Sequence, residues 1–415
     1  MNRPFERVAV VGLGYIGLPT AAVLAGTGIE VVGVDINSET VDTINRGEIH
    51  IVEPALDALV RQTVMTGRLR ATTVPESADA FIIAVPTPFK GQHEPDLSYV
   101  EAAAKAVAPY LKKGDLVILE STCPVGTTGQ MTRWLAEARP DLAFPMEYGA
   151  GADINVAYCP ERVLPGKVLA ELVSNDRVIG GITPQCSARA RSLYQHFVKG
   201  ECILANARTA EMCKLTENSF RDVNIAFANE LSLICDKLGI NVWELVRLAN
   251  HHPRVNILNP GPGVGGHCIA VDPWFIVDSA PELAKIIATA RAVNDNKPQY
   301  VVDKVKATAR SFDEPTIACL GLAFKADIDD LRESPAVQIV EMLAKEPMRL
   351  LLVEPFITAL PKGFAGSDNV SLVSLEEALQ QADIVVGLVD HTCFEQIDRE
   401  LLKHKTVIDA RGIWG

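Results

Sequence analysis

The stretch RVAVVGLGYIGLPTAAVLAGTGIEVVGVD, residues 7–35, decides the fold. It predicts a short strand, a glycine-rich turn, a helix and a second strand, and the pattern Gly12-x-Gly14-x-x-Gly17 opens the helix. The three glycines suit a tight turn, the close approach of a pyrophosphate, and the packing of the helix on the sheet. Asp35 ends the second strand, where it would accept a hydrogen bond from a ribose 2′-hydroxyl and repel a 2′-phosphate. Since the strand, helix and acid agree, the stretch predicts a site for NAD rather than chance turn glycines.

The same stretch superficially resembles a signal peptide or a membrane span, because residues 8–29 carry no charge. Three glycines and Pro19 interrupt any continuous helix, however, and a second apolar run follows directly after Glu30. We therefore expect a soluble β-turn-α-β unit, although glycine is also frequent in membrane helices.

The overall composition is that of a globular protein. The chain has 415 residues, 48% of them hydrophobic and 22% charged, which predicts two or three domains and excludes wholesale disorder or a coiled-coil rod. The net charge is −13, from 39 Lys and Arg against 52 Asp and Glu, and the basic residues form no cluster. This balance argues against nucleic acid and anionic membranes as partners. An anionic ligand would have to be held by a few local cations or by helix N-termini.

The nine cysteines indicate neither a disulfide framework nor a metal site. Their number is odd, the gaps between them are long, and no C-x-x-C pair occurs. We expect mostly buried thiols in a protein of the reducing cytoplasm, with no bound metal.

Strands and helices alternate along the N-terminal part of the chain. The runs RVAVVG, VVGVD, AFIIAV, LVILE, INVAYC and RVIGG are short and apolar, as parallel strands buried on both faces are. The loops 86–96 and 121–128 follow strands, where a doubly wound sheet binds its ligands. Residues 207–238 lack Gly and Pro and predict one long helix, which suggests a connecting element or a dimer core.

The alternation returns near residue 315, where TIACLGLAFK resembles VAVVGLGYIG and Glu354 ends a second strand as Asp35 does. The second and third glycines are missing, so we expect a nucleotide-binding-like domain that no longer holds a dinucleotide. The predicted fold class is α/β, with two Rossmann-like doubly wound domains joined by a long central helix and a helical dimerisation region. The predicted domains are residues 1–205, 206–311 and 312–415.

Two further patterns carry reactive groups. Cys268 ends the glycine-rich run GPGVGGHC, and Asp272 follows four residues later, where both could share a helical face. A nucleophile and a buried structural thiol in a tight turn are equally good interpretations of this cysteine. Lys214 and Asn218 project from one face of the long helix with Glu211 beside them, and a solvated charged stripe is the ordinary alternative.

The order of the motifs resembles that of one enzyme family. Seven motifs span almost the whole chain: GLGYIGLP, VPTP (85–88), ESTCPVGTT (120–128), CPERVLPG (159–166), KLTENSFRDVNIAFANEL (214–231), GVGGHCIAVDP (263–273) and GLAFKADIDDLRESP (321–335). The chain thereby resembles the nucleotide-sugar 6-dehydrogenases, which act on UDP-glucose or UDP-N-acetylmannosamine. His267 and the loop HHPRVN (251–256) resemble the UDP-N-acetyl-D-mannosamine branch, whereas the UDP-glucose branch usually has serine before its cysteine.

The resemblance implies a four-electron oxidation of UDP-N-acetyl-D-mannosamine at C6 to UDP-N-acetyl-D-mannosaminuronate. It implies two NAD⁺ per sugar and a role in bacterial surface polysaccharide synthesis, of the enterobacterial common antigen type. The intermediate aldehyde would be captured as a thiohemiacetal, oxidised to a thioester and released by water. The catalytic residues that the resemblance implies are the nucleophile Cys268, Lys214 and Asp272 in proton transfer, Asn218 with the oxyanion, Thr122 beside a water and Glu161 in hydrolysis.

Binding residues follow from the motifs and the resemblance together. For the cofactor they are Gly12, Gly14, Tyr15, Ile16, Gly17, Asp35, Pro86, Thr87, Ser121, Thr122, Lys325 and Arg332. For the UDP-sugar they are Glu161, Arg162, Val163, Leu164, Lys214, Asn218, Arg221, Arg254, Asn256, Gly263, His267, Phe324, Lys325 and Arg411. The resemblance also implies a homodimer, which we expect across residues 207–238, with Arg254 reaching the substrate of the neighbouring subunit.

The sequence departs from the family pattern at two positions. Cys123 stands where relatives often have valine or serine, and we interpret it as a packing residue rather than a second nucleophile. Ala270 stands where proline is common, which removes no chemical group.

Three alternatives stay open on the sequence alone. A UDP-glucose or UDP-N-acetylglucosamine dehydrogenase would act on a sugar that differs at only one or two stereocentres. A single-step β-hydroxyacid dehydrogenase also has Lys and Asn on a central helix, but it needs no cysteine and makes one NADH per turnover. A non-catalytic NAD sensor would have no use for the cysteine loop.

Overall fold

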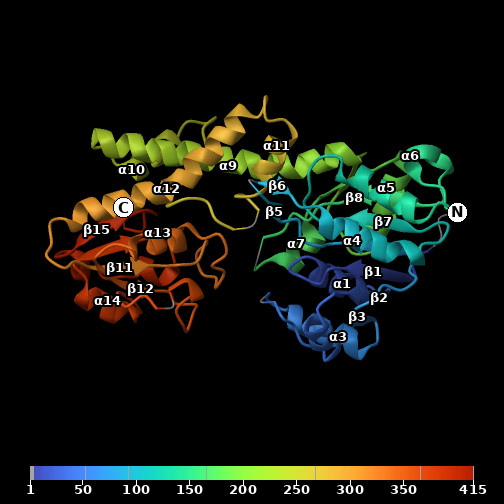
Figure 1. Ribbon diagram of the computed structural model, residues 1–415, viewed down its shortest axis with the longest axis horizontal. Coiled ribbons are helices and arrows are strands. Elements are labelled where there is room, and N and C mark those ends of the chain that lie inside the picture. The colour runs from blue at the N-terminus through green and yellow to red at the C-terminus, as the bar shows by residue number, and fades with distance from the viewer. Residues whose placement is uncertain are drawn as a thin grey trace. The chain divides into compact units, whose positions relative to one another are not determined.

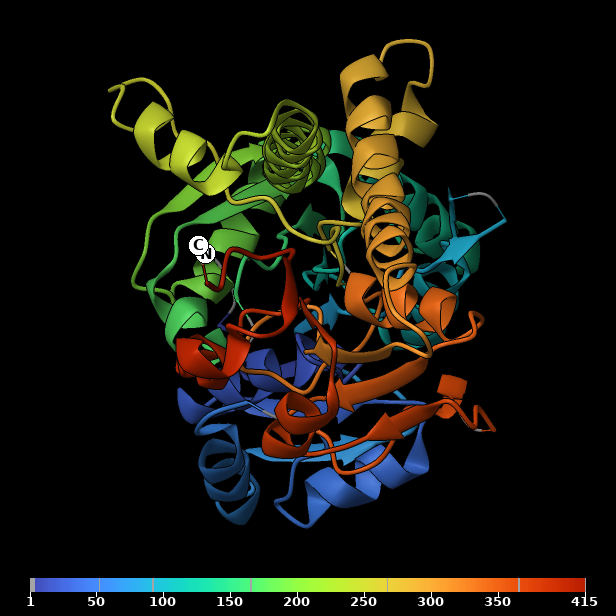
Figure 2. The same ribbon diagram turned by 90° about the vertical axis from the view of Figure 1, so that its left-hand side faces the viewer.

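The computed structural model describes residues 4–51, 53–91, 93–164, 166–266, 268–364 and 366–414. The chain divides into two compact units, residues 1–217 and 218–415, and each is built around one sheet (Figures 1 and 2). The helix α9 (Ala207–Leu238) begins in the first unit and continues into the second. It confirms the long helix that the sequence predicts for these residues. The predicted α/β class with two doubly wound sheets is confirmed, while the three domain boundaries stay a prediction.

The first unit contains an eight-stranded sheet of order β10-β9-β8-β7-β4-β1-β2-β3. Its strands are β1 (Arg7–Val11), β2 (Glu30–Val34), β3 (Leu69–Thr72), β4 (Ala80–Ile83), β7 (Leu116–Leu119), β8 (Asn155–Tyr158), β9 (Arg177–Gly181) and β10 (Cys202–Asn206). All six predicted runs are strands. The sequence did not predict β3 and β10, which are the two edge strands of this sheet and are only partly buried. A small hairpin of β5 (Phe89–Lys90) and β6 (Glu94–Pro95) lies inside the loop after β4.

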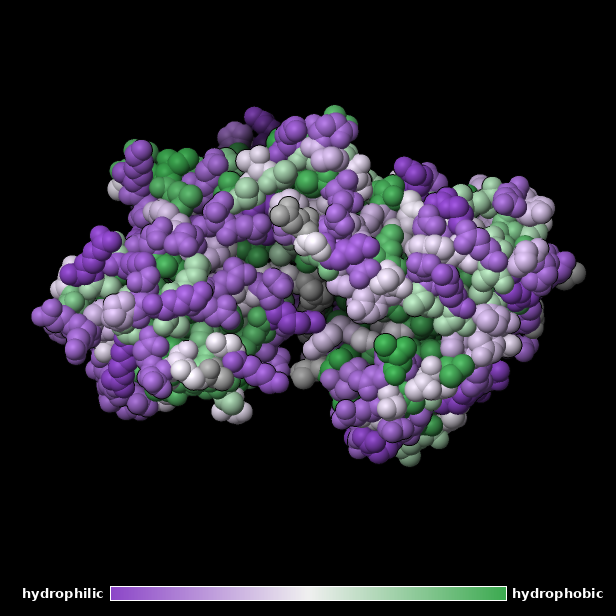
Figure 3. All heavy atoms as spheres, in the orientation of Figure 1, coloured by the Kyte–Doolittle hydropathy of each residue, from purple (hydrophilic) through white to green (hydrophobic). Residues whose placement is uncertain are grey.

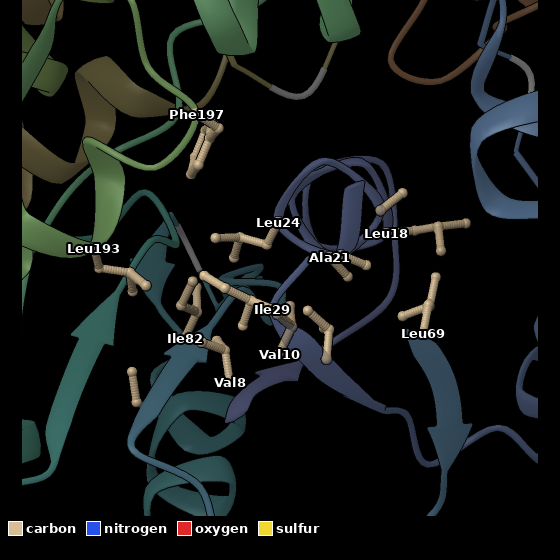
Figure 4. Packing of buried hydrophobic residues seen from close by; sticks show 14 of the residues in the cluster. Val8, Val10, Leu18, Ala21, Leu24, Ile29, Leu69, Ile82, Leu193 and Phe197 are labelled. Carbon is tan, nitrogen blue, oxygen red and sulfur yellow. The ribbon is translucent and has the colours of Figure 1, made fainter. Parts of the chain in front are cut away.

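Helices cover both faces of this sheet. They are α1 (Gly17–Gly26), α2 (Ser38–Asn45), α3 (Leu56–Met65), α4 (Ser98–Val107), α5 (Thr127–Ala138), α6 (Pro145–Tyr148), α7 (Val168–Ser174) and α8 (Pro184–Tyr194). Successive strand residues point to opposite faces, so Val8 and Val10 pack with α1, α3 and α8, as Figure 4 shows for part of this cluster. Ala9 and Val11 pack instead with α4 and α5. This two-sided burial explains why the strands are continuous apolar runs.

One expectation about the strands is wrong, because β9 is not parallel to β8. The two strands pair antiparallel, with Tyr158 opposite Gly180. The connection between them contains the seven-residue helix α7 and brings the chain back to the edge where β8 ends. A parallel pairing would need a crossover to the opposite edge of the sheet. Continuing the antiparallel register past Tyr158 sets Glu161 opposite Arg177, the first residue of β9.

Helices precede the sheet of the second unit. They are the main part of α9, then α10 (Val242–Ala249), α11 (Asp272–Ser279) and α12 (Lys285–Ala309). Asp222 of α9 forms a buried ion pair with Arg291 of α12 at 2.7 Å, and Asn229 donates to Asn294 at 2.8 Å. These polar contacts hold α9 and α12 together at one register, because each buried group would be costly without its partner.

The second unit ends in a parallel five-stranded sheet of order β13-β12-β11-β14-β15. Its elements are β11 (Thr316–Leu320), α13 (Pro335–Leu343), β12 (Arg349–Val353), β13 (Val370–Leu372), α14 (Leu375–Gln381), β14 (Ile384–Gly387), α15 (Thr392–Glu395) and β15 (Thr406–Asp409). Residues of α12 and α13 pack on one face, and residues of α14 and α15 pack on the other. This sheet is doubly wound like the first, as its sequence alternation predicts.

All nine cysteines belong to the described residues, and none of them forms a disulfide. Of the helices in the described part of the chain, none combines the length and apolar character needed to cross a bilayer.

The turn after the first strand has the same geometry in both sheets. Gly12 has φ +90° and donates to Val34 O at 2.8 Å, and Gly321 has φ +93° and donates to Val353 O at 2.8 Å. The left-handed backbone at both positions favours glycine. The sequence echo between these segments is thus a real structural repeat.

We expect Gly321→Ala to destabilise the second unit strongly. The new Cβ would lie 2.3 Å from Val389 Cβ, in addition to the strain of φ +93°. The free energy of unfolding should fall by about 3 kcal/mol or more, as measured by chemical denaturation. Gly366→Ala is the matched control, because Gly366 has φ +92° with no atom within 4 Å of a Cβ, so only the strain of about 1–2 kcal/mol remains. Equal losses in the two variants would contradict the packing argument.

Candidate functional site

The glycine-rich turn of the first unit has room for a dinucleotide. A Cβ on Gly12 would lie 2.5 Å from Ala84 O, and one on Gly17 would lie 1.8 Å from Gly12 O. Gly14 differs, because it is exposed and a Cβ there meets no atom within 4 Å. The turn leads into α1, whose N-terminal end favours negative charge. The open backbone at Gly14 therefore fits a pyrophosphate, and the half-buried Ile16 and exposed Tyr15 lie in the same turn.

Asp35 follows β2 and is half-buried beside this turn. Its Oδ2 accepts from Leu13 N at 2.9 Å and its Oδ1 accepts from Asn37 N at 2.9 Å. Each carboxylate oxygen has a further lone pair, so Asp35 can still accept from a ribose hydroxyl. The acid thus shapes the glycine turn as well as fitting the predicted ligand contact.

The two loops after β4 and β7 are joined to each other. Thr87 Oγ1 donates to Thr122 O at 2.6 Å, and Ser121 Oγ donates to Val85 O at 2.6 Å. The structure therefore brings Thr87, Ser121 and Thr122 together, with Pro86 exposed in the same loop. Cys123 is completely buried in the sheet core, which agrees with its interpretation as a packing residue.

Glu211 corrects one sequence interpretation, because it is not part of a solvated charged stripe. It is fully buried in α9, and it accepts from Gly126 N at 2.6 Å, Thr128 N at 2.8 Å and Thr128 Oγ1 at 2.6 Å. Burial raises the pKa of Glu211 above its ordinary value, and these hydrogen bonds oppose the rise. Glu211 therefore anchors the start of α5 and the loop before it. Lys214, one turn further along α9, is half-buried.

Glu161 belongs to a buried charge cluster at the ends of β7 and β8. Its Oε2 lies 2.8 Å from Arg177 Nη1 without hydrogen-bond alignment, and its Oε1 accepts from Arg162 N at 2.7 Å. Glu120 lies 3.8 Å from the same guanidinium nitrogen. Burial, together with the charge of Glu161, raises the pKa of Glu120 to about 8. Two buried acids thus share one buried cation.

The loop 162–164 is already held by acids of the same unit. The guanidinium of Arg162 pairs with Glu217 through Nε at 3.0 Å and Nη2 at 2.7 Å. Leu164 N donates to Glu171 Oε2 at 2.8 Å, and Leu164 is exposed while Val163 is half-buried. A substrate that used the Leu164 amide would have to share or displace the Glu171 contact.

The end of this loop is held by a carboxylate from a distant segment. Glu53 is buried and accepts from Gly166 N at 2.9 Å and from Val168 N at 2.8 Å. Glu53 therefore fixes the start of α7, and it is a site-shaping residue that the sequence did not reveal.

The predicted nucleophile and its acid lie together in the second unit. Cys268 is half-buried one turn before α11, and Asp272 N donates to Cys268 O at 2.9 Å. Asp272 is 2% exposed, and its Oδ2 accepts from Asn218 Nδ2. The one-turn spacing predicted for Cys268 and Asp272 is thus a helical turn, with Asn218 bonded to the acid. His267 lies outside the described residues.

The glycine-rich run before Cys268 packs against the connection between β11 and α13 in the second unit. Gly261 N donates to Asn229 Oδ1 at 2.8 Å. A Cβ on Gly263 would lie 2.9 Å from Pro335 Cβ, and one on Gly266 would lie 2.9 Å from the ring of Phe324. The structure therefore joins Gly263 and Phe324, two predicted substrate residues, to the cysteine loop.

The predicted basic residues of the second unit are mostly paired or exposed. Arg411 donates to Asp390 Oδ1 through Nε at 3.0 Å and Nη2 at 2.7 Å, and it lies against Gly261. Arg332 pairs with Asp330 at 2.6 Å on the surface. The remaining basic residues of this group, Lys325, Arg221 and Arg254, are exposed, and so is the predicted polar residue Asn256.

Several residues that shape the site were not assigned from the sequence. The sequence contains a sign of Glu120 and Arg177, since each is a charged residue at the end of an apolar run that forms a buried strand. The sequence contains no such sign of Glu53 and Glu211, because their hydrogen-bond partners lie 83 to 115 residues away in the chain.

Comparison with known proteins adds three family matches in chain order. The NAD binding domain of the UDP-glucose/GDP-mannose dehydrogenase family matches residues 6–198, its central domain matches residues 208–296, and its UDP binding domain matches residues 318–415.

Individual relatives are similar over almost their full length. An NDP-N-acetyl-D-galactosaminuronic acid dehydrogenase of Ralstonia nicotianae is 65% identical, over 99% of this chain and 96% of that protein. A UDP-N-acetyl-D-mannosamine dehydrogenase of Yersinia pestis is 63% identical, over 99% of both chains. The solved UDP-D-ManNAc dehydrogenase of Pyrococcus horikoshii is 41% identical with a TM-score of 0.88, over 99% of this chain and 96% of that one.

We expect Glu211→Ala to destabilise the first unit, because it removes the acceptor of the Gly126 and Thr128 amides. Three charge-assisted bonds are lost, so the free energy of unfolding should fall by about 2–4 kcal/mol in chemical denaturation. Thr216→Ala changes an exposed residue of the same helix and serves as the control, with a change within about 0.5 kcal/mol. Similar values for the two variants would show that Glu211 is not an anchor.

Proposed function

The chain belongs to the UDP-glucose/GDP-mannose dehydrogenase family, and from this membership we propose that it oxidises UDP-N-acetyl-D-mannosamine at C6 to UDP-N-acetyl-D-mannosaminuronate. The observation that carries the choice of sugar is the 63% identity, over 99% of both chains, to a relative named for that substrate. Two observations support the chemistry: the turn at Gly14 is open, and Asp272 lies one helical turn after Cys268. A role in surface polysaccharide synthesis stays a prediction from the resemblance.

NAD⁺, when bound, accepts a hydride in each of two oxidation steps. The backbone of Gly12, Gly14 and Gly17 would hold its pyrophosphate, and Asp35 would accept from a ribose hydroxyl. The other residues that we assign to the cofactor are Tyr15, Ile16, Pro86, Thr87, Ser121, Thr122, Lys325 and Arg332.

Cys268 acts as the nucleophile in this proposal. Its thiolate adds to the C6 aldehyde to give a thiohemiacetal, whose further oxidation leaves a thioester, and water then releases the carboxylate and the thiol. The sum is one alcohol and one water converted to one carboxylate, with two NAD⁺ reduced to two NADH and three protons released. The covalent bond keeps the aldehyde on the protein between the two oxidations.

The residues beside Cys268 handle protons and developing charge. Asp272 is buried and accepts from the Asn218 amide, so its carboxylate is held in one orientation for proton transfer. We assign the second proton-transfer role to Lys214 and the stabilisation of the oxyanion to Lys214 with Asn218.

Thioester hydrolysis requires a base, which we assign to Glu161, with Thr122 positioning the water. Glu161 Oε2 is buried and has no hydrogen bond within the described part of the chain, so it can accept one from water. Its other contact on this side is Arg177, whose Nη1 lies 2.8 Å from Oε2 and fixes the position of the carboxylate.

The UDP-sugar would be held by two groups of residues. We propose that Phe324, Lys325 and Arg411 bind the nucleotide, because they lie in the segment that matches a UDP binding domain. The sugar and its phosphates would be met by Arg162, Val163, Leu164, Arg221, Asn256, Gly263 and His267. Lys214 and Asn218 would contact the sugar as well as take part in the chemistry.

A second candidate substrate is an NDP-linked N-acetyl-D-galactosamine derivative. It is favoured by the 65% identity, over 99% of this chain, to a relative named NDP-N-acetyl-D-galactosaminuronic acid dehydrogenase. The two sugars differ in configuration around the ring, and the reaction at C6 is the same.

Purified protein should release two NADH per uronate with one preferred UDP-sugar, because the oxidation removes four electrons. The test offers UDP-N-acetyl-D-mannosamine, UDP-N-acetyl-D-galactosamine, UDP-N-acetylglucosamine and UDP-glucose with excess NAD⁺, and it measures NADH absorbance and product mass. Cys268→Ser should lower uronate formation by at least about 10³-fold and leave NAD⁺ binding unchanged.

Cys393→Ser is the matched control, because Cys393 is exposed in α15. One NADH per product, or normal turnover of Cys268→Ser, would overturn the covalent mechanism. Preference for the galactosamine sugar would select the second candidate.

A homodimer through α9 is the assembly that we propose. Phe220, Phe227 and Ile234 are spaced by seven residues on this helix and are 69%, 52% and 46% exposed. A stripe of this spacing suits packing against another helix, and Figure 3 shows apolar surface beside hydrophilic surface in the region of α9 and α10. Arg254 would then reach the site of the neighbouring subunit.

Phe227→Asp should shift the protein from dimer to monomer, because it puts a charge into the apolar stripe. Sedimentation velocity at micromolar concentration measures the change, and the dissociation constant should rise at least about tenfold. Asp278→Ala, at an exposed position of α11, should leave the dimer intact. A monomeric wild-type protein would refute the proposed interface.

A further inference from the structure

Three ionisable side chains are almost completely buried where β7, β8 and β9 meet in the first unit. Arg177 is 1% exposed, Glu120 is 2% exposed and Glu161 is 7% exposed. Arg177 Nη1 lies 2.8 Å from Glu161 Oε2 and 3.8 Å from Glu120 Oε1. One guanidinium therefore faces two carboxylates.

The charges of this cluster cannot all be compensated if both acids are ionised. The other titratable groups that face Glu120 are Cys159 at the end of β8 and Tyr194 of α8. Burial raises the pKa of Cys159 to about 12 and raises that of Tyr194, so both are neutral at neutral pH. Two ionised acids would leave one uncompensated negative charge in the interior, which is a costly arrangement.

Geometry indicates which acid gives up its charge. Glu161 is closer to Arg177 than Glu120 is, and its other oxygen accepts a backbone hydrogen bond from Arg162 at 2.7 Å. The contacts to Glu120 come from two neutral hydroxyls, Tyr194 OH at 3.2 Å and Thr20 Oγ1 at 3.2 Å. Because electrostatic attraction falls with distance, the negative charge is best placed on Glu161.

The two hydroxyls are also compatible with a protonated Glu120. A hydroxyl both donates and accepts and can rotate, so a neutral Glu120 can donate to one of them and accept from the other. Burial and the neighbouring charge of Glu161 raise the pKa of Glu120 to about 8, which agrees with this assignment.

We propose that Glu120 carries a proton at neutral pH. A neutral Glu120 does not compete for the guanidinium of Arg177, which then pairs with Glu161 alone and holds the Glu161 carboxylate in one position. Glu120 is thus a positioning residue that acts through Arg177. It also connects α1, through Thr20, to the acid pair. When Glu120 ionises at alkaline pH, it competes for Arg177 and loosens the hold on Glu161. The consequence for turnover rests on the proposed role of Glu161 in hydrolysis, whereas the protonation of Glu120 does not.

Glu120→Gln tests the protonation, because glutamine keeps the shape and the neutral state but cannot ionise. In the unfolded chain Glu120 loses its proton near pH 4.5, and in the folded protein it keeps the proton up to about pH 8. The folded wild-type protein then binds one proton more than the unfolded chain, so this contribution to stability is lost as the pH rises through that window. The ratio of the folding constants of Glu120→Gln and wild type should therefore rise by up to about tenfold per pH unit.

Urea denaturation from pH 5 to pH 9 measures this ratio, and Glu137→Gln, an exposed glutamate of α5, is the control with a constant ratio. Carbon-13 NMR of the wild-type protein labelled at the glutamate carboxyl carbons gives a second measurement. The resonance that is missing in Glu120→Gln should titrate near pH 8 rather than near pH 4.5. A constant ratio of folding constants, or an acidic titration of that resonance, would overturn the proposal.

The pH profile of kcat separates this proposal from the proposed function. With the preferred sugar, the alkaline decline of kcat should be weaker in Glu120→Gln than in the wild-type protein, and identical profiles would refute the positioning role. If no sugar is oxidised, the NMR and stability results still decide whether Glu120 holds the proton. If sugars are oxidised but Glu120 titrates as an ordinary acid, the enzyme assignment stands and the inference about Glu120 fails.

Discussion

Carboxylates that accept backbone N–H groups hold the functional loops of this protein. Asp35 holds the glycine turn through Leu13 N, Glu211 holds the loop after β7, Glu53 holds the loop after β8, and Glu354 holds the turn of the second sheet. Loops at the carboxyl ends of strands expose amides that the sheet does not pair, and a carboxylate can bind two of them at once. Each such bond contributes about 1.5–3 kcal/mol, and an amide left without its acceptor would be costly. The loops can therefore carry glycine and still keep one conformation.

The turns at Gly12 and Gly321 have the same geometry, but the carboxylate beside each turn is buried to a different extent. In the first, Asp35 is half-buried and keeps lone pairs that face solvent. In the second, Glu354 Oε2 accepts from Leu322 N and Ala323 N and lies 3.1 Å from His391 Nε2, while Oε1 accepts from Phe356 N at 3.2 Å. Burial would raise the pKa of Glu354, but the bonds from His391 and the two amides hold it below its ordinary value. The carboxylate that could meet a ribose in the first sheet is thus enclosed by protein in the second, which supports the expectation that the second sheet holds no dinucleotide.

The chain is acidic overall, and three of the arginines predicted to bind the substrate or the cofactor are paired with carboxylates. Arg162, Arg332 and Arg411 each pair with a carboxylate of their own unit. Such pairs fix the direction of a long side chain at little net gain in stability near the surface. An anionic nucleotide would therefore meet oriented single cations, with no broad basic surface required.

The sequence by itself determined the features whose cause lies within a few residues. The pattern from Gly12 to Asp35 encodes a turn, a helix and a strand, because the backbone at each glycine position has no room for a larger residue or must stay open to a ligand. The one-turn spacing of Cys268 and Asp272 depends in the same way on residues that are close in the sequence. Only the tertiary structure decided that β9 runs antiparallel and thereby sets Arg177 beside Glu161, and that Glu211 is an anchor instead of a surface charge. Those contacts join residues far apart in the chain. They depend on strand order and register, which leave no periodic trace in the sequence.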